Sequence, residues 1–307
     1  MDAILGQTEA VTFLRSRLTA PPHLILWGPT GVGKTMLANA WIAEQLAAQG
    51  VTDPAQQAAM TLRLSSADER GIAAIRQRLT EFVRQRRPIP GTTAWVLFDD
   101  ADNINGKDHV VVQQALRRIM ELNAHQTRFC FIAQSPEHFI EPIQSRCVIL
   151  QLHPVMLHTC AATLAAKEAP ASKPTEDALQ LMAALCMGNV RQFVLICRAL
   201  PPGPVSVTDI QLLVNAPPVT LLQRLQTATI HRDIGGVTEA ILALWSRGYS
   251  FEDIVAMLET VVRIYSPLLT DEQQYVLQCC AEGHICQILN RTTLLDLIGV
   301  FVPTPYL

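Results

Sequence analysis

The sequence predicts an α/β domain, with a parallel sheet covered by helices on both faces, followed by a region that is helical throughout. Three observations lead to this prediction. A glycine-rich loop joins an apolar strand to a helix near the N-terminus, further apolar runs alternate with helical segments, and no strand-like run follows Pro154. Alternating strands and helices are typical of a parallel sheet, because each crossover needs a connection long enough to return the chain.

The first strand is predicted over residues 23–27, and the helix that follows the loop is predicted over residues 35–49. The loop between them has the spacing G-x-x-x-x-G-K-T of a phosphate-binding loop. In this motif backbone N–H groups approach phosphate oxygens, the lysine reaches the β and γ phosphates, and the threonine holds Mg²⁺. The sequence therefore predicts a site for ATP and Mg²⁺. The residues assigned to the nucleotide here are Gly28, Pro29, Thr30, Gly31, Val32, Gly33, Lys34, Thr35 and Met36.

Four more strands are expected, over residues 62–64, 94–98, 129–133 and 148–150. Helices are expected between them, over residues 71–87 and 112–123. The central runs are apolar throughout, as in strands that are buried on both faces of a sheet.

Two carboxylates, Asp99 and Asp100, end the third of these five apolar runs. An acidic strand end alone is equally typical of a solvated turn. Beside a phosphate loop it indicates the Walker B element, in which the first carboxylate lies next to Mg²⁺ and the second orients the attacking water. We therefore expect Asp99 to bind the metal together with Thr35, and Asp100 to be catalytic.

Beyond Pro154 the sequence predicts helices over residues 155–168 and 175–200, the second broken near Gly188 and Asn189. A proline-rich break and a second boundary follow near residues 201–204 and 215–218. Ser250 and Asp253 have the spacing of a capping box, which begins an amphipathic helix. These boundaries divide the chain into an ATPase domain (1–153), a helical lid domain (154–216) and a C-terminal helical domain (217–307).

The composition is that of a globular protein, with 49% hydrophobic and 17% charged residues. The net charge of −3 does not indicate a nucleic-acid-binding protein, so only a local basic patch could serve that role. The eight cysteines lack zinc-binding spacing, which favours reduced thiols in an intracellular protein. We expect no signal peptide and no membrane span, because no run reaches the roughly 20 apolar residues that a span requires.

Three segments resemble the small subunits of replication factor C, the AAA+ clamp loader of eukaryotes and archaea. They are Asp99–Asp102, Gln113–Glu121 and Ile140–Cys147, and the triplet Ser-Arg-Cys that ends the last one is the most specific. The likeness begins at Ile4 and continues into residues 244–250, so it covers almost the whole chain.

This resemblance implies an AAA+ module with a helical lid and an all-α collar that mediates oligomerisation. It implies a pentamer with other clamp loader subunits, which uses ATP to open a ring-shaped sliding clamp and place it on primer-template DNA. The location would be the nucleus if the source is a eukaryote, and otherwise intracellular.

The resemblance also assigns individual residues. Arg146 would be an arginine finger that acts on the ATP of the neighbouring subunit, and Arg191 would be the lid arginine that touches phosphate in its own subunit. Ile4 and Leu5 would clasp the adenine, and Gln134 would be the polar sensor that addresses the attacking water. Without the resemblance, Arg146 is typical of an ordinary strand entry and Arg191 of a helix surface.

Two positions depart from the family pattern. Asp100 stands where the family normally has Glu, and Gln134 stands where it usually has Asn. One side chain is shorter and the other longer, so the two changes could compensate if both address the same water. They also favour an alternative, a subunit of the same complex that binds ATP but hydrolyses it weakly. A third reading is a different AAA+ remodeller, such as a helicase loader.

Arginines are concentrated between residues 70 and 87. A charged helix surface would explain them, but in clamp loaders the corresponding helices follow the template backbone. Backbone contacts of this kind need no interleaved aromatic residues. The candidate DNA contacts are Arg70, Arg76, Arg84 and Arg117.

Overall fold

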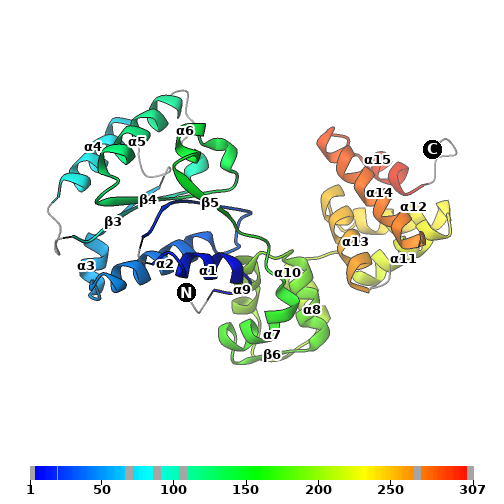
Figure 1. Cartoon of the computed structure of the whole chain (residues 1–307). Helices are drawn as coiled ribbons and strands as arrows, with labels where there is room; N and C mark the ends of the chain where they lie inside the picture. Colours follow the sequence, from blue (N-terminus) through cyan, green and yellow to red (C-terminus); the bar gives the residue numbers. More distant parts are fainter. Residues whose placement is uncertain are drawn as a thin grey trace. The chain divides into compact units, whose positions relative to one another are not determined.

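A computed structural model describes residues 4–18, 20–65, 72–85, 91–103, 109–265 and 271–302. The chain forms two compact units. The first comprises Met1–Met156 together with Gly188–Arg191, and the second comprises Leu157–Met187 together with Gln192–Leu307. Figure 1 gives the order of the elements along the chain.

The first unit contains a five-stranded parallel sheet with the strand order β2-β3-β4-β1-β5. The central strands β3, β4 and β1 are largely buried, which explains their uninterrupted apolar sequences. Each predicted strand is present, and most are longer than the sequence pattern indicated. The strands are β1 (His23–Trp27), β2 (Thr61–Ser65), β3 (Ala94–Asp99), β4 (Thr127–Ala133) and β5 (Cys147–Gln151).

Helices cover both faces of this sheet, as predicted. In Figure 1, α1, α2 and α3 lie on one side of the strands, and α4, α5 and α6 lie on the other. α5 begins three residues before the predicted start. The bounds are α1 (Thr8–Arg15), α2 (Lys34–Ala48), α3 (Pro54–Ala59), α4 (Ile72–Arg84), α5 (His109–Asn123) and α6 (Glu141–Gln144), with short 3₁₀ turns η1 (Ala101–Asn103) and η2 (Pro136–His138).

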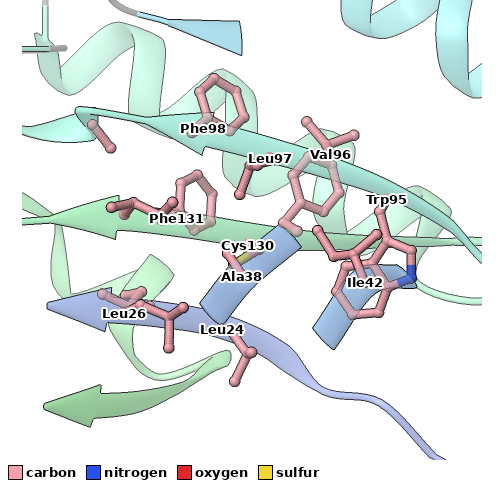
Figure 2. Packing of buried hydrophobic residues seen from close by; sticks show 14 of the residues in the cluster. Leu24, Leu26, Ala38, Ile42, Trp95, Val96, Leu97, Phe98, Cys130 and Phe131 are labelled. Atoms are coloured by element: carbon pink, nitrogen blue, oxygen red, sulfur yellow. The ribbon is translucent and has the colours of Figure 1, made fainter. Parts of the chain in front are cut away.

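The core of the first unit lies between the sheet and these helices. Figure 2 shows Ala38 and Ile42 of α2 beside the strand residues Cys130 and Trp95. Trp41 and Trp95 are fully buried and pack edge to face with their ring centroids 4.7 Å apart. Such a pair contributes about 1 kcal/mol beyond the burial of its surface. This packing fixes α2, and with it the loop that precedes α2, against the sheet.

The second unit is mainly helical. α9 begins in the first unit and continues into the second. α11 packs against α12, α13 and α14, and α8 contacts α13. The helices are α7 (Leu157–Glu168), α8 (Glu176–Leu185), α9 (Val190–Ala199), α10 (Val207–Val214), α11 (Val219–Ile230), α12 (Ile234–Trp245), α13 (Phe251–Tyr265), α14 (Asp271–Ile288) and α15 (Leu294–Phe301). The boundary between a lid and a C-terminal domain near residue 216 stays a prediction.

The expectation that no strand follows Pro154 was wrong. β6 (Ser172–Pro174) and β7 (Gly203–Val205) form a second, two-stranded parallel sheet. Gly203 N donates to Ala171 O over 3.0 Å, and Thr175 N donates to Val205 O over 3.0 Å. These strands are three residues long and contain proline or glycine, so no apolar run marks them in the sequence.

Helix ends follow the predicted signals closely. The predicted helix over 175–200 is divided into α8 and α9 at Met187 and Gly188, which both have positive φ angles. Ser250 and Asp253 form the predicted capping box, in which Asp253 N donates to Ser250 Oγ over 3.1 Å and Ser250 N donates to Asp253 Oδ2 over 3.0 Å. These reciprocal bonds satisfy backbone groups that the first turn of α13 would otherwise leave unpaired.

All eight cysteines are unpaired thiols, and five of them are buried. Burial raises the pKa of Cys197 and of Cys279 to about 11. Because the thiolate is the reactive form, Cys197 and Cys279 are less reactive at neutral pH than a free cysteine. Among the described residues, no helix combines the length and the apolar character needed to cross a membrane.

Candidate nucleotide site

The phosphate-binding loop connects β1 to α2 and depends on glycine at defined positions. Gly28, Gly31 and Gly33 have φ angles of 149°, 76° and 98°, a region that disfavours residues with a Cβ. A Cβ on Gly28 would clash with the carbonyl oxygen of Leu152, and a Cβ on Gly31 would clash with the side chain of Asn189. The loop is thus closely packed on two sides as well as sharply turned.

The side chain of Lys34 binds to backbone carbonyl groups of its own loop. Its Nζ donates to Gly28 O over 2.6 Å and to Pro29 O over 2.8 Å. Burial lowers the pKa of Lys34, while the nearby carboxylates of Asp102, Asp100 and Asp99 raise it and Arg191 lowers it further. The Lys34 ammonium group is therefore near the carboxylates at and after the end of β3, while it donates to carbonyl oxygens of its own loop.

Thr35 and Asp99 are in contact at the end of β3. The Thr35 hydroxyl, in the first turn of α2, donates to Asp99 Oδ1 at the end of β3 over 3.2 Å. A hydroxyl and a carboxylate are oxygen ligands of the kind that Mg²⁺ prefers. The structure thus brings together the two residues that the sequence assigned to the metal.

Asp100 has an unusual backbone conformation. Its φ angle is +50°, its side chain is exposed, and its N–H donates to Asp99 Oδ1 over 3.1 Å. Aspartate enters this left-handed region more readily than most residues with a side chain. The Asp100 side chain is thus open to solvent, whereas Asp99 is half-buried.

Asp102 has a role that the sequence did not assign. Its carboxylate accepts hydrogen bonds from the backbone N–H of Gln134, over 2.7 Å and 2.9 Å to its two oxygens, and from Ser135 N over 3.4 Å. It therefore ties the turn after β3 to the end of β4, where the proposed sensor Gln134 is exposed. The acidic run Asp99-Asp-Ala-Asp102 was the only sequence signal for this residue.

Arg191 belongs to the same unit as the loop. Val190 N donates to Gly31 O over 3.1 Å, and Val155 N donates to Gly188 O over 3.2 Å. Together with the effect of Arg191 on the pKa of Lys34, these bonds place the start of α9 beside the phosphate loop.

The residues assigned to the adenine, Ile4 and Leu5, lie in a segment that packs against the residues after β5. Ile4 and Leu5 are half-buried, and Gln7 Nε2 donates to His153 O over 2.7 Å. A Cβ on Gly6 would come within 2.7 Å of the Val155 side chain. Met36, at the start of α2, is 63% exposed. The start of the described chain is thus fixed to residues 153–155, which follow β5.

Arg146 lies at the opposite end of the strands from the phosphate loop. It precedes Cys147, which pairs with His23 at the beginning of β1, whereas the loop follows Trp27 at the end of β1. Four residue steps along a strand separate its two ends by about 13 Å. The Arg146 side chain is 40% exposed, and its Nη2 lies 2.6 Å from Glu121 Oε1. Arg146 is therefore not part of the nucleotide site of its own chain.

Two of the four candidate DNA contacts can be located in full. Arg84, at the end of α4, is exposed, and Arg117 of α5 lies with its Nε 3.3 Å from Glu121 Oε1. α4 and α5 are in contact with each other. Arg70 and the side chain of Arg76 lie outside the described residues.

Comparison with known proteins shows the family of the chain. Residues 24–154 match the ATPase family associated with various cellular activities (AAA). The replication factor C small subunit of Staphylothermus marinus is 34% identical over 233 residues, which cover 74% of this chain and 68% of that protein. The chain belongs to the replication factor C small-subunit family. The resemblance that the motifs indicated is thereby confirmed.

Two further relatives extend the replication factor C similarity along the chain. Replication factor C small subunit 2 of Pyrobaculum islandicum is 30% identical over 97% of this chain and 91% of its own length. Replication factor C subunit 4 of Schizosaccharomyces pombe is 28% identical over 98% of this chain and 86% of its own length. The AAA fold is also seen in a solved structure of a Thermotoga maritima RuvB variant, with a TM-score of 0.52 and 15% identity over 73% of this chain and 77% of that chain. The chain is thus a member of an ATPase family.

Proposed function

We propose that this chain is a small subunit of an ATP-dependent clamp loader. It would act as one of five subunits that open a ring-shaped sliding clamp and place it on primer-template DNA. The similarity to replication factor C subunits over nearly the whole chain supports this function. If the source is a eukaryote, the proposed location is the nucleus, and otherwise the cell interior.

The position of Arg146 carries the proposal. The chain has a complete phosphate loop, but Arg146 of the Ser-Arg-Cys triplet lies at the other end of the strands. An arginine stabilises charge on transferring phosphoryl oxygens only where it can reach them. Under this proposal Arg146 serves the nucleotide of another subunit, so that hydrolysis depends on assembly.

Within the chain, each residue has a separate task. Lys34 would hold the β and γ phosphates, and Thr35 and Asp99 would hold Mg²⁺. When bound, this ion would neutralise charge on the phosphates and orient them. Asp100 and Gln134 would position the attacking water, and Arg191 would contact phosphate from the start of α9.

Weak hydrolysis is the second candidate function, and Asp100 is the observation that favours it. The shorter side chain withdraws the carboxylate by about 1 Å relative to glutamate, and a displacement of that size can lower a rate roughly 100-fold. Under this alternative the chain would bind ATP, hydrolyse it slowly, and still donate Arg146 to its neighbour.

The test is a loading assay with the chain in complex with its native partner subunits. ATP-dependent transfer of a ring clamp onto primed circular DNA is expected, and Lys34→Ala or Arg146→Ala should abolish or strongly reduce it. Recovery of the chain with a helicase or junction DNA, and without companion AAA+ subunits or a clamp, would reject the proposal in favour of another AAA+ remodeller.

A further inference from the structure

One carboxylate oxygen contacts two of the arginines discussed above. Glu121, near the end of α5, has its Oε1 2.6 Å from Nη2 of Arg146 and 3.3 Å from Nε of Arg117. The Arg146 contact is a close ion pair between the guanidinium and the carboxylate. The Arg117 contact is close enough for an ion pair, but Nε of Arg117 is not aligned for a hydrogen bond.

Arg146 is held at a second point. Its Nη1 donates to the carbonyl oxygen of Pro142 in α6 over 2.8 Å. A guanidinium group is planar, so fixing both terminal nitrogens fixes the orientation of the whole group. Each terminal nitrogen carries two N–H bonds, which leaves further donors that can face a phosphate outside the chain.

The pair contributes little to folding stability. The side chains of Arg146 and Glu121 are 40% and 36% exposed. Solvent-exposed ion pairs of this kind have small stabilising effects, because water screens the charges and the side chains lose conformational freedom. A role in orienting Arg146 therefore accounts for the short contact better than a role in stability does.

We propose that Glu121 is a positioning residue for Arg146. It would hold the guanidinium at the angle needed to reach the triphosphate of the neighbouring subunit, without touching that triphosphate itself. This inference rests on the proposed function, since it concerns an arginine that acts in trans. A misplaced finger loses stabilisation of the transition state, so removal of Glu121 should lower the rate of hydrolysis rather than the affinity for ATP.

The test uses single-turnover ATP hydrolysis by the chain assembled with its partner subunits. The phase of hydrolysis that Arg146→Ala removes defines the neighbouring site that Arg146 serves. In that phase Glu121→Ala should slow hydrolysis roughly tenfold, while the ATP concentration at half-saturation stays within about twofold. In the double variant, Glu121→Ala should add nothing to the effect of Arg146→Ala.

Glu44→Ala is the matched control. Glu44 of α2 is paired with Arg15 of α1 at 3.7 Å, with side-chain exposures of 32% and 42%, and lies in the same unit. The Glu44→Ala variant should leave the rate of ATP hydrolysis in that phase unchanged. Elution of each complex at its normal size shows that the variants assemble. If Glu121→Ala fails to assemble, Glu121→Gln keeps the shape and removes the charge, and the same comparison applies with a smaller expected slowing.

The outcomes separate the two proposals. If Arg146→Ala removes a phase but neither Glu121 variant slows it, the positioning role is wrong and the proposed function stands. If Glu121→Ala slows hydrolysis further in the Arg146→Ala background, Glu121 acts by another route and the inference is also wrong. If Arg146→Ala removes no phase at all, trans action itself fails, and the role of Glu121 fails with it.

Discussion

Thr35 and Asp99 are 64 residues apart in the chain, yet the hydroxyl of one donates to the carboxylate of the other over 3.2 Å. The contact joins the first turn of α2 to the end of β3. Asp99→Asn should therefore lower ATP hydrolysis roughly 100-fold, since an amide lacks the charge that a divalent cation requires. The measurement is the steady-state rate in the complex at saturating Mg²⁺ and ATP. Asp177→Asn, an exposed aspartate of α8, should have no effect, and equal rates for both variants would contradict the metal assignment.

Gly31→Ala should disrupt the loop for two separable reasons. The added Cβ would stand in the left-handed region and would clash with the side chain of Asn189. Gly50 has a similar φ of +85°, but no atom lies near the position that a Cβ would take. Gly50→Ala therefore measures the cost of the backbone conformation without a clash. We expect a loss of about 1 kcal/mol in the free energy of unfolding for Gly50→Ala. For Gly31→Ala we expect about 1–3 kcal/mol more, together with weaker nucleotide binding.

Chemical denaturation and nucleotide titration of the native protein, Gly31→Ala and Gly50→Ala measure these effects. Adding Asn189→Ala to Gly31→Ala should recover the part of the loss that comes from the clash. No recovery in the double variant would show that Asn189 does not restrict the loop.

Asp100→Glu alone should not raise the rate of ATP hydrolysis, although it restores the residue usual in the family. The position has a φ of +50°, which suits aspartate better than glutamate, and the proposed sensor is Gln134 rather than the shorter Asn. The double variant with Gln134→Asn should be faster than Asp100→Glu. Rates from single-turnover experiments decide this, and a large increase from Asp100→Glu by itself would refute the compensation.

The motifs made the phosphate loop, Asp99 and the buried strands predictable, because their spacing and apolar character are local properties. The bonds from Asp102 to the backbone of residues 134–135 were not predictable, since a carboxylate that accepts from backbone amides leaves no pattern in the partner sequence. The contact between Glu121 and Arg146 was likewise not predictable from the sequence. The strands β6 and β7 were missed because backbone pairing alone defines them.

Arg84 and Arg117 should contribute to the affinity for primer-template DNA without regard to its sequence. Each lost phosphate contact lowers the slope of log affinity against log salt concentration by about 0.9 in duplex regions. Arg84→Ala and Arg117→Ala are expected to lower DNA-stimulated ATP hydrolysis, and Arg247→Ala, an exposed arginine of the second unit, should not. Binding measured at several salt concentrations gives the slopes, and slopes unchanged from the native protein would reject the assignment.

His23 makes the stability of the first unit dependent on pH. Its Nδ1 accepts a hydrogen bond from Phe129 N over 3.1 Å, which requires a neutral ring. Burial, assisted by the charge of Arg128, lowers its pKa from 6.5 to about 4. Between these values the unfolded chain binds more protons than the folded chain, so stability falls as the pH is lowered from 6.5 towards 4. The loss from this residue amounts to about 3 kcal/mol.

His23→Asn places an acceptor near the same position and cannot be protonated, so it should flatten the dependence of the unfolding free energy on pH in that range. Denaturation midpoints between pH 4 and pH 7 measure the slope. His125→Asn, which changes an exposed histidine, should leave the slope as it is in the native protein. If the unfolding free energies of the native protein and of His23→Asn fall in parallel as the pH is lowered, other groups cause the acid sensitivity. If His23 causes it, replacing the imidazole should remove that part of the pH dependence.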